Sequence, residues 1–332
     1  MLNNTLDHNL TSFRSTIILV AIFFGSIAIM LNFIIIIYLI RHGKFAKYSK
    51  KQRSRRVGLL HSINTYIHLI GLLATLVIMC IRTLYGDLYQ EKRGENFISW
   101  HCHFLGYLMS LFGAGVYGSC FLQALYRFWR IITPNRDLFQ NLCFHIHLIL
   151  VHWIFIITLL IPILSRSVYI SSDHFCLSPF NDRWTAAYIS LITAVIPVTG
   201  IFILYIKIVI HMKHNLQTKK QWRRMKRDIS TIRRILLLVL IILQTSSTGI
   251  ILWILTFFYK SFHPLFYRLL RFLMILCMLI CSITLLMVSP ELKRAFQSSS
   301  HKQLKKRYYT SKKQTSLNNT NEITQIQNIP RS

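Results

Sequence analysis

Residues 16–40 read TIILVAIFFGSIAIMLNFIIIIYLI, a run of 25 residues without a single Asp, Glu, Lys or Arg. A helix of about 20 apolar residues is long enough to cross the hydrocarbon core of a bilayer. Six more uncharged runs follow along the chain, at 57–81, 97–126, 138–165, 184–206, 235–259 and 272–290. A buried helix of a soluble protein can explain one such run, but seven in succession predict an all-α membrane protein with a seven-transmembrane-helix bundle.

The composition points to the same class. Of the 332 residues, 53% are hydrophobic and only 15% are charged, whereas soluble domains carry about 25% charged residues. The formal charge of +29 would suit a nucleic-acid-binding protein, but here the basic residues alternate with the uncharged runs and form no continuous soluble face. Nucleic acid is therefore not an expected partner.

The distribution of Lys and Arg predicts the orientation. Thirty of the 39 basic residues lie on one side of the predicted bundle, and nine lie on the other. Because the basic side of a membrane protein faces the cytosol, we expect the amino terminus outside and the carboxyl terminus inside. Two glycosylation sequons, at Asn3 and Asn9, then lie on the outer side.

This topology divides the chain into four segments. We expect an extracellular, glycosylated amino terminus at 1–15, a transmembrane domain at 16–289, an amphipathic helix on the membrane surface at 290–298 and a disordered cytosolic tail at 299–332. The first apolar run is too long for a cleavable signal peptide. The charged ends of Arg268 and Arg271 are expected to reach the lipid headgroups, so that the last transmembrane helix begins near Leu265.

The third run carries the most distinctive motif. Cys102 opens it and Arg127 closes it within the stretch ALYRFWRI (124–131), and Pro134 follows seven residues after the arginine. Other residues occur in matching order in the remaining runs: Asn32, Trp153, Pro162, Pro197 and Tyr205. Their joint order and spacing resemble those of the rhodopsin-like (family 1) G-protein-coupled receptors, of which this chain looks like a divergent member.

The resemblance implies a multi-pass receptor of the plasma membrane that binds an extracellular ligand and activates a heterotrimeric G protein. It also implies a disulfide between Cys102 and Cys176, and a coupling site at Arg127, Tyr205, Tyr126 and Pro134 in which Tyr205 holds the arginine in the active arrangement. A kinase and arrestin are candidate partners at the tail. Neither a cofactor nor an enzymatic activity is implied.

The chain departs from the family pattern at several points. Tyr126 stands where the family has an acidic residue, so the usual ion pair cannot restrain Arg127. The second run has no carboxylate for a sodium site, and His68, near that position, is expected to form a hydrogen bond between helices. The run at 235–259 contains no proline, and the last run lacks the Asn-Pro-x-x-Tyr signature.

Some ligand classes can be excluded. No Asp or Glu occurs within the runs, and Met109 stands where amine receptors carry an aspartate, so an amine ligand is not expected. The last run contains no Lys, which excludes a retinal Schiff base. The acidic and aromatic outer loops slightly favour a peptide over a small apolar molecule, and the candidate ligand contacts are Met109, Trp184, Asp173 and Asp182.

Two other functions are compatible with a bundle of seven helices. A seven-helix zinc hydrolase is disfavoured, because His145 and His147 would point about 160° apart on a helix and cannot share a metal. A channel or transporter without G-protein coupling remains the alternative function.

Overall fold

The computed structural model describes residues 2–43, 50–89, 95–133, 136–165, 168–170, 175–177, 183–214 and 264–288. In chain order, the elements are α1 (Leu2–Gly43), α2 (Lys50–Tyr89), α3 (Glu95–Ile132), the 3-10 turn η1 (Asp137–Gln140), α4 (Leu142–Leu164), β1 (Val168–Ile170), β2 (Phe175–Leu177), α5 (Arg183–Ser190), the π-helical turn η3 (Leu191–Val195), α6 (Ile196–His214) and α8 (Pro264–Val288).

Six helical stretches are long and apolar enough to cross a membrane: Phe13–Arg41, Arg56–Leu88, Trp100–Ile132, Leu142–Leu164, Ala187–His211 and Arg268–Met287. They coincide with six of the seven predicted runs, which confirms the helical membrane bundle. The run at 235–259, the amphipathic helix at 290–298 and the tail lie outside the described residues. Helix α1 begins at Leu2, so it also includes residues 2–15, which precede the predicted span.

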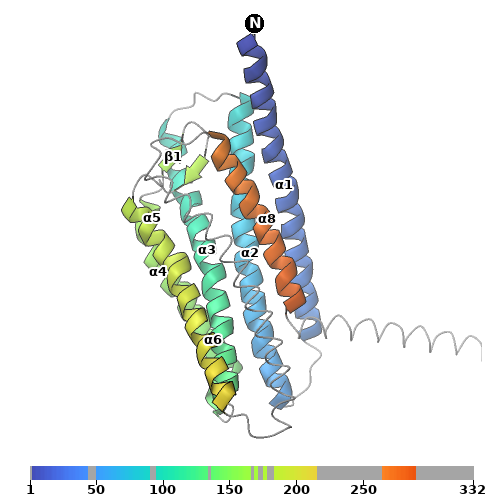
Figure 1. Ribbon diagram of the computed structural model, residues 1–332, viewed down its shortest axis with the longest axis vertical. Helices are drawn as coiled ribbons and strands as arrows, with labels where there is room; N and C mark the ends of the chain where they lie inside the picture. Colours follow the sequence, from blue (N-terminus) through green and yellow to red (C-terminus); the bar gives the residue numbers. More distant parts are fainter. Residues whose placement is uncertain are drawn as a thin grey trace, which may run out of the picture. The chain divides into compact units, whose positions relative to one another are not determined.

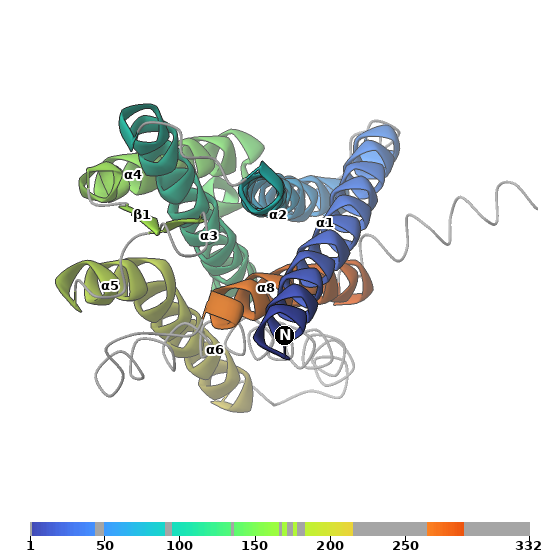
Figure 2. The same ribbon diagram turned by 90° about the horizontal axis from the view of Figure 1, so that it is seen from above.

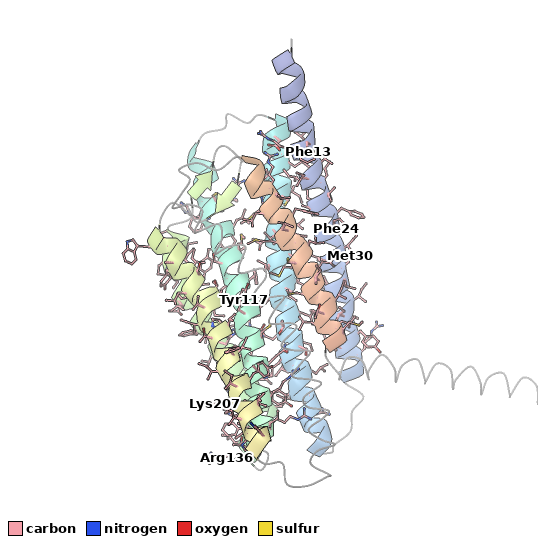
Figure 3. The ribbon with its side chains drawn as sticks, viewed as in Figure 1. Phe13, Phe24, Met30, Tyr117, Arg136 and Lys207 are labelled. Atoms are coloured by element: carbon pink, nitrogen blue, oxygen red, sulfur yellow. The ribbon has the colours of Figure 1, made fainter. Side chains whose placement is uncertain are left out.

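Helix α3 occupies the centre of the arrangement (Figure 1). It contacts α2, α4, α6 and both strands, whereas α1 packs against α2 and α8. Seen along the bundle, α1 lies on the side away from α4 and α6 (Figure 2). Apolar side chains cover the outer faces, such as Met30 on α1, which is 63% exposed and points away from the other helices (Figure 3). Such a surface is stable in lipid.

A short hairpin connects α4 to α5. Strands β1 and β2 pair antiparallel, with Tyr169 opposite Cys176. Both strands pack against α3. The sequence patterns did not predict this hairpin, because each strand has only three residues.

A change of helix type marks the middle of the span formed by α5, η3 and α6. The π-helical turn η3 ends two residues before Pro197. Proline has no N–H to donate and its ring crowds the preceding turn, so a wider local turn relieves the helix there.

The arginines of α8 do not reach lipid headgroups, so that prediction was wrong. Arg268 is 3% exposed and Arg271 is 2% exposed. Arg268 donates two hydrogen bonds to the carboxylate of Asp87 on α2, with N–O distances of 2.6 and 2.9 Å. Arg271 donates to the hydroxyl of Thr83 at 2.6 Å. The two contacts lie about one helical turn apart along both helices. Helix α8 begins at Pro264, next to the expected start.

Candidate functional site

Arg127 and Tyr205 lie on neighbouring helices near one end of the bundle. Arg127 belongs to the last turns of α3, and Tyr205 belongs to α6, which packs against α3. Tyr205 is 5% exposed. Within the part of the chain that the structure describes, the Nη1 atom of Arg127 and the Tyr205 hydroxyl are both buried and have no hydrogen-bond partner. The two residues are thus neighbours in the fold but are not hydrogen-bonded to each other in this arrangement.

Tyr126 is buried among aromatic rings of α2 and α4. Its ring meets that of His145 edge to face, with centroids 5.2 Å apart and an interplanar angle of 89°. It also contacts His61 on α2, with a centroid distance of 5.7 Å. In place of the acidic residue of the family, this chain therefore has a tyrosine that packs between α2 and α4.

His61 and His145 form a buried hydrogen-bonded pair. They are 1% and 0% exposed, and Nε2 of His61 lies 3.1 Å from Nδ1 of His145. Nε2 of His145 lies 2.9 Å from the carbonyl oxygen of Phe139 in η1. A carbonyl only accepts, so Nε2 of His145 is the donor. With both rings neutral, Nδ1 of His145 then accepts the proton of His61 Nε2, and one tautomer of each ring is selected.

Trp129 completes the packing around η1. Its ring stacks on Phe139 at a centroid distance of 4.7 Å and an angle of 13°. It also meets Phe144 on α4 edge on, at 5.7 Å. The turn between α3 and α4 is therefore held by a ring stack from α3 and by a hydrogen bond from α4.

A second layer of polar contacts lies further along α2, α3 and α4. Nε1 of Trp153 donates to Oδ1 of Asn64 at 3.0 Å. His68 stacks on Trp153 with centroids 4.2 Å apart and an angle of 19°. Among the described residues, neither ring nitrogen of His68 has a hydrogen-bond partner, so the expected interhelical hydrogen bond is replaced by this stack.

Two glycines of α3 make room for histidine rings. A Cβ atom on Gly115 would lie 2.0 Å from Nδ1 of His68, and one on Gly118 would lie 2.0 Å from Nε2 of His152. These rings rest directly on the backbone of α3. By contrast, a Cβ on Gly113 would meet no atom within 4 Å. The sequence shows these glycines, but it does not show which of them a neighbouring ring contacts.

The remaining helix residues of the predicted motif lie inside their helices. Asn32 is fully buried and donates to the carbonyl of Ala28 at 2.8 Å. Pro162 lies within α4, and Ser165 donates to its carbonyl at 3.0 Å.

The structure describes two of the four predicted ligand contacts, Met109 and Trp184. Trp184 is 84% exposed at the start of α5, so it is not enclosed in a pocket. Met109 is half-buried within α3. Asp173, Asp182 and Pro134 lie outside the described residues.

The cysteines differ in their bonding. Cys102, at the start of the α3 span, is disulfide-bonded, whereas five others form no disulfide: Cys80, Cys120, Cys143, Cys277 and Cys281. The seventh cysteine of the chain is Cys176 in β2. This strand packs against α3.

Comparison with known proteins identifies the family. No curated protein matches the chain. Residues 55–287 match the family described as 7 transmembrane receptor (rhodopsin family). The match covers more than two thirds of the 332 residues and runs from α2 to α8, including residues 235–259, which the structure does not describe. The chain therefore belongs to the rhodopsin family of seven-transmembrane receptors and is a G-protein-coupled receptor of divergent sequence.

Proposed function

We propose that the chain is a plasma-membrane receptor that binds an extracellular ligand and activates a heterotrimeric G protein through Arg127 and Tyr205. The observation that supports this most is that the Nη1 atom of Arg127 on α3 and the Tyr205 hydroxyl on α6 are both buried and have no hydrogen-bond partner among the described residues. A buried polar group without a partner costs about 1–3 kcal/mol, so a bond between these two groups would offset part of the free-energy cost of a second arrangement. A ligand that stabilises the second arrangement would shift the population towards it.

The outer face is the proposed ligand site. A disulfide between Cys102 and Cys176 would hold β2 against α3, and the loop carrying Asp173 and Asp182 would then lie close to the outer end of the bundle. Acidic side chains there, together with the exposed Trp184, suit a peptide ligand. At the tail, a kinase and arrestin are the proposed further partners. The alternative, a channel or transporter, would instead give ion or solute flux in bilayers containing the purified chain alone.

Replacing Arg127 by Ala is expected to reduce G-protein activation at least tenfold, because a charge-assisted hydrogen bond contributes about 1.5–3 kcal/mol. Dissociation sensors for each G-protein class, read with and without pooled peptide extracts, measure this effect. The matched control is Arg130→Ala, which removes an exposed arginine three residues away on the same helix. Equal signals from both variants at equal surface expression would contradict the proposed role of Arg127.

The proposed topology places residues 1–15 outside and residues 290–332 inside. We expect peptide N-glycosidase to increase the gel mobility of the wild-type receptor from mammalian cells. The double variant Asn3→Gln/Asn9→Gln should show no such shift. A third sequon, at Asn318, lies in the proposed cytosolic tail and provides the control. A shift that depends on Asn318 and not on Asn3 or Asn9 would show the reverse orientation.

A further inference from the structure

We propose that His145 and His61 act as positioning residues that hold η1 in place on the inner face of the receptor, where η1 meets the G protein. The inference rests on the proposed function for its last step, because only a cytosolic partner gives the position of η1 a consequence. Its first steps concern the receptor alone.

The turn η1 has little support of its own. It has four residues. Its flanking backbone bonds are Arg136 N–H to the carbonyl of Thr133 at 3.4 Å, and Asn141 N–H to the carbonyl of Leu138 at 3.0 Å. A single helical turn is not stable alone, since few hydrogen bonds offset its conformational entropy. The position of η1 must therefore come from its contacts with the long helices.

Three such contacts meet at Phe139. Its ring stacks on Trp129 and meets the ring of Phe144 edge to face, and its carbonyl accepts the hydrogen bond from Nε2 of His145. Of these three, only the hydrogen bond acts on the backbone of η1. Because His145 is fully buried, water does not compete for its Nε2–H, whereas the acceptor residue Phe139 is half-buried.

His61 determines that His145 donates at the correct nitrogen. A neutral imidazole carries its proton on either Nδ1 or Nε2, and the partner of one nitrogen selects the state of the other. Nε2 of His61 approaches Nδ1 of His145 at 3.1 Å, so His61 supplies a donor there and leaves the proton of His145 on Nε2. Without this donor, the proton of His145 could lie on Nδ1 instead. Nε2 would then face the Phe139 carbonyl with a lone pair and could not donate to it. His61 thus acts on η1 through His145.

The turn η1 and the residue before it expose side chains that a partner could contact. Leu138 is 61% exposed, and Arg136, which precedes η1, is also exposed. Arg136 and Lys207 of α6 lie at the same end of the bundle (Figure 3). An exposed leucine beside basic side chains suits a protein partner with an apolar contact and acidic residues at its rim.

Two variants of similar size separate the two hydrogen bonds of His145. In His145→Gln, the amide nitrogen can reach the position of Nε2 and still donate to Phe139. In His145→Asn, the shorter amide reaches only the position of Nδ1, so the bond to His61 can remain but the bond to η1 is lost. The corresponding pair at the second residue is His61→Gln, which can keep the donor, and His61→Phe, which removes it.

The experiment measures each variant as the full-length receptor in nanodiscs. Hydrogen–deuterium exchange of residues 136–141 reports the order of η1, and nucleotide exchange on purified heterotrimeric G protein reports coupling. The thermal unfolding midpoint serves as the folding control. We expect exchange in this segment to rise about fivefold in His145→Asn and His61→Phe, as for the loss of one hydrogen bond. The two Gln variants should stay near wild type, and coupling should fall only where exchange rises.

The outcomes distinguish this inference from the proposed function. Unchanged exchange in His145→Asn, or the same rise in His145→Asn and His145→Gln, overturns the positioning role. A rise in exchange without a loss of coupling overturns the link between η1 and the partner. If the wild-type receptor activates no G protein while the exchange pattern is as expected, the proposed function fails and the positioning of η1 by the histidines stands.

Discussion

Replacing Asp87 by Ala is expected to destabilise the receptor by about 3–5 kcal/mol, because it leaves the buried guanidinium of Arg268 without its carboxylate. The pair joins α2 to α8 through two short hydrogen bonds, and Arg268 has only 3% of its side chain exposed. The Asp87 side chain is 18% exposed, which favours the lower end of the range. Thermal unfolding of the purified receptor and its surface expression measure the effect.

The control for this prediction removes both charges. The double variant Asp87→Ala/Arg268→Leu should recover most of the lost stability, since replacing both partners of a buried ion pair by apolar residues is often neutral. A double variant that is no more stable than Asp87→Ala alone would show that packing, rather than an uncompensated charge, causes the loss.

The second large effect is expected at Gly115. Alanine there would place a methyl group 2.0 Å from the ring of His68, which is 1% exposed and stacked on Trp153, so the ring has no free space to enter. Overpacking of this kind costs about 1–3 kcal/mol. We therefore expect Gly115→Ala to lower the unfolding midpoint and the surface expression.

The corresponding substitution two residues earlier, Gly113→Ala, should stabilise the receptor rather than destabilise it. Gly113→Ala meets no atom within 4 Å, and alanine is favoured over glycine within a helix by about 1 kcal/mol. Combining Gly115→Ala with His68→Ala should relieve the contact at the glycine. Equal effects of Gly113→Ala and Gly115→Ala would contradict the close approach of His68 to α3.

The helical spans could be predicted from the sequence because bilayer thickness imposes a length and a composition on each helix separately. The same local information gave the wrong environment for Arg268 and Arg271. A charged residue near the end of a span has the same sequence neighbourhood whether it reaches the headgroups or pairs with another helix. The partner of Arg268 is 181 residues away in the chain.

The histidine pair shows a similar limit. The sequence allows a test of whether His145 and His147, on one helix, could share a metal ion. It does not show that the partner of His145 lies 84 residues earlier, on α2. One signal could have indicated it. His61 and His68 are seven residues apart, and so are His145 and His152. Seven residues are two helical turns, so each helix carries two histidines on one face.

The ion pair between α2 and α8 also constrains the biosynthesis of the receptor. An arginine near the centre of a helix raises the free energy of insertion into lipid by about 2.5–3.5 kcal/mol on translocon-based scales, and less near the end. Helix α8 carries two arginines near its amino-terminal end, and their partners, Asp87 and Thr83, are on α2. The last span therefore gains stability in the membrane when it meets the second, which is synthesised earlier. The contact between α2 and α8 therefore joins a helix that is made early in synthesis to one that is made late.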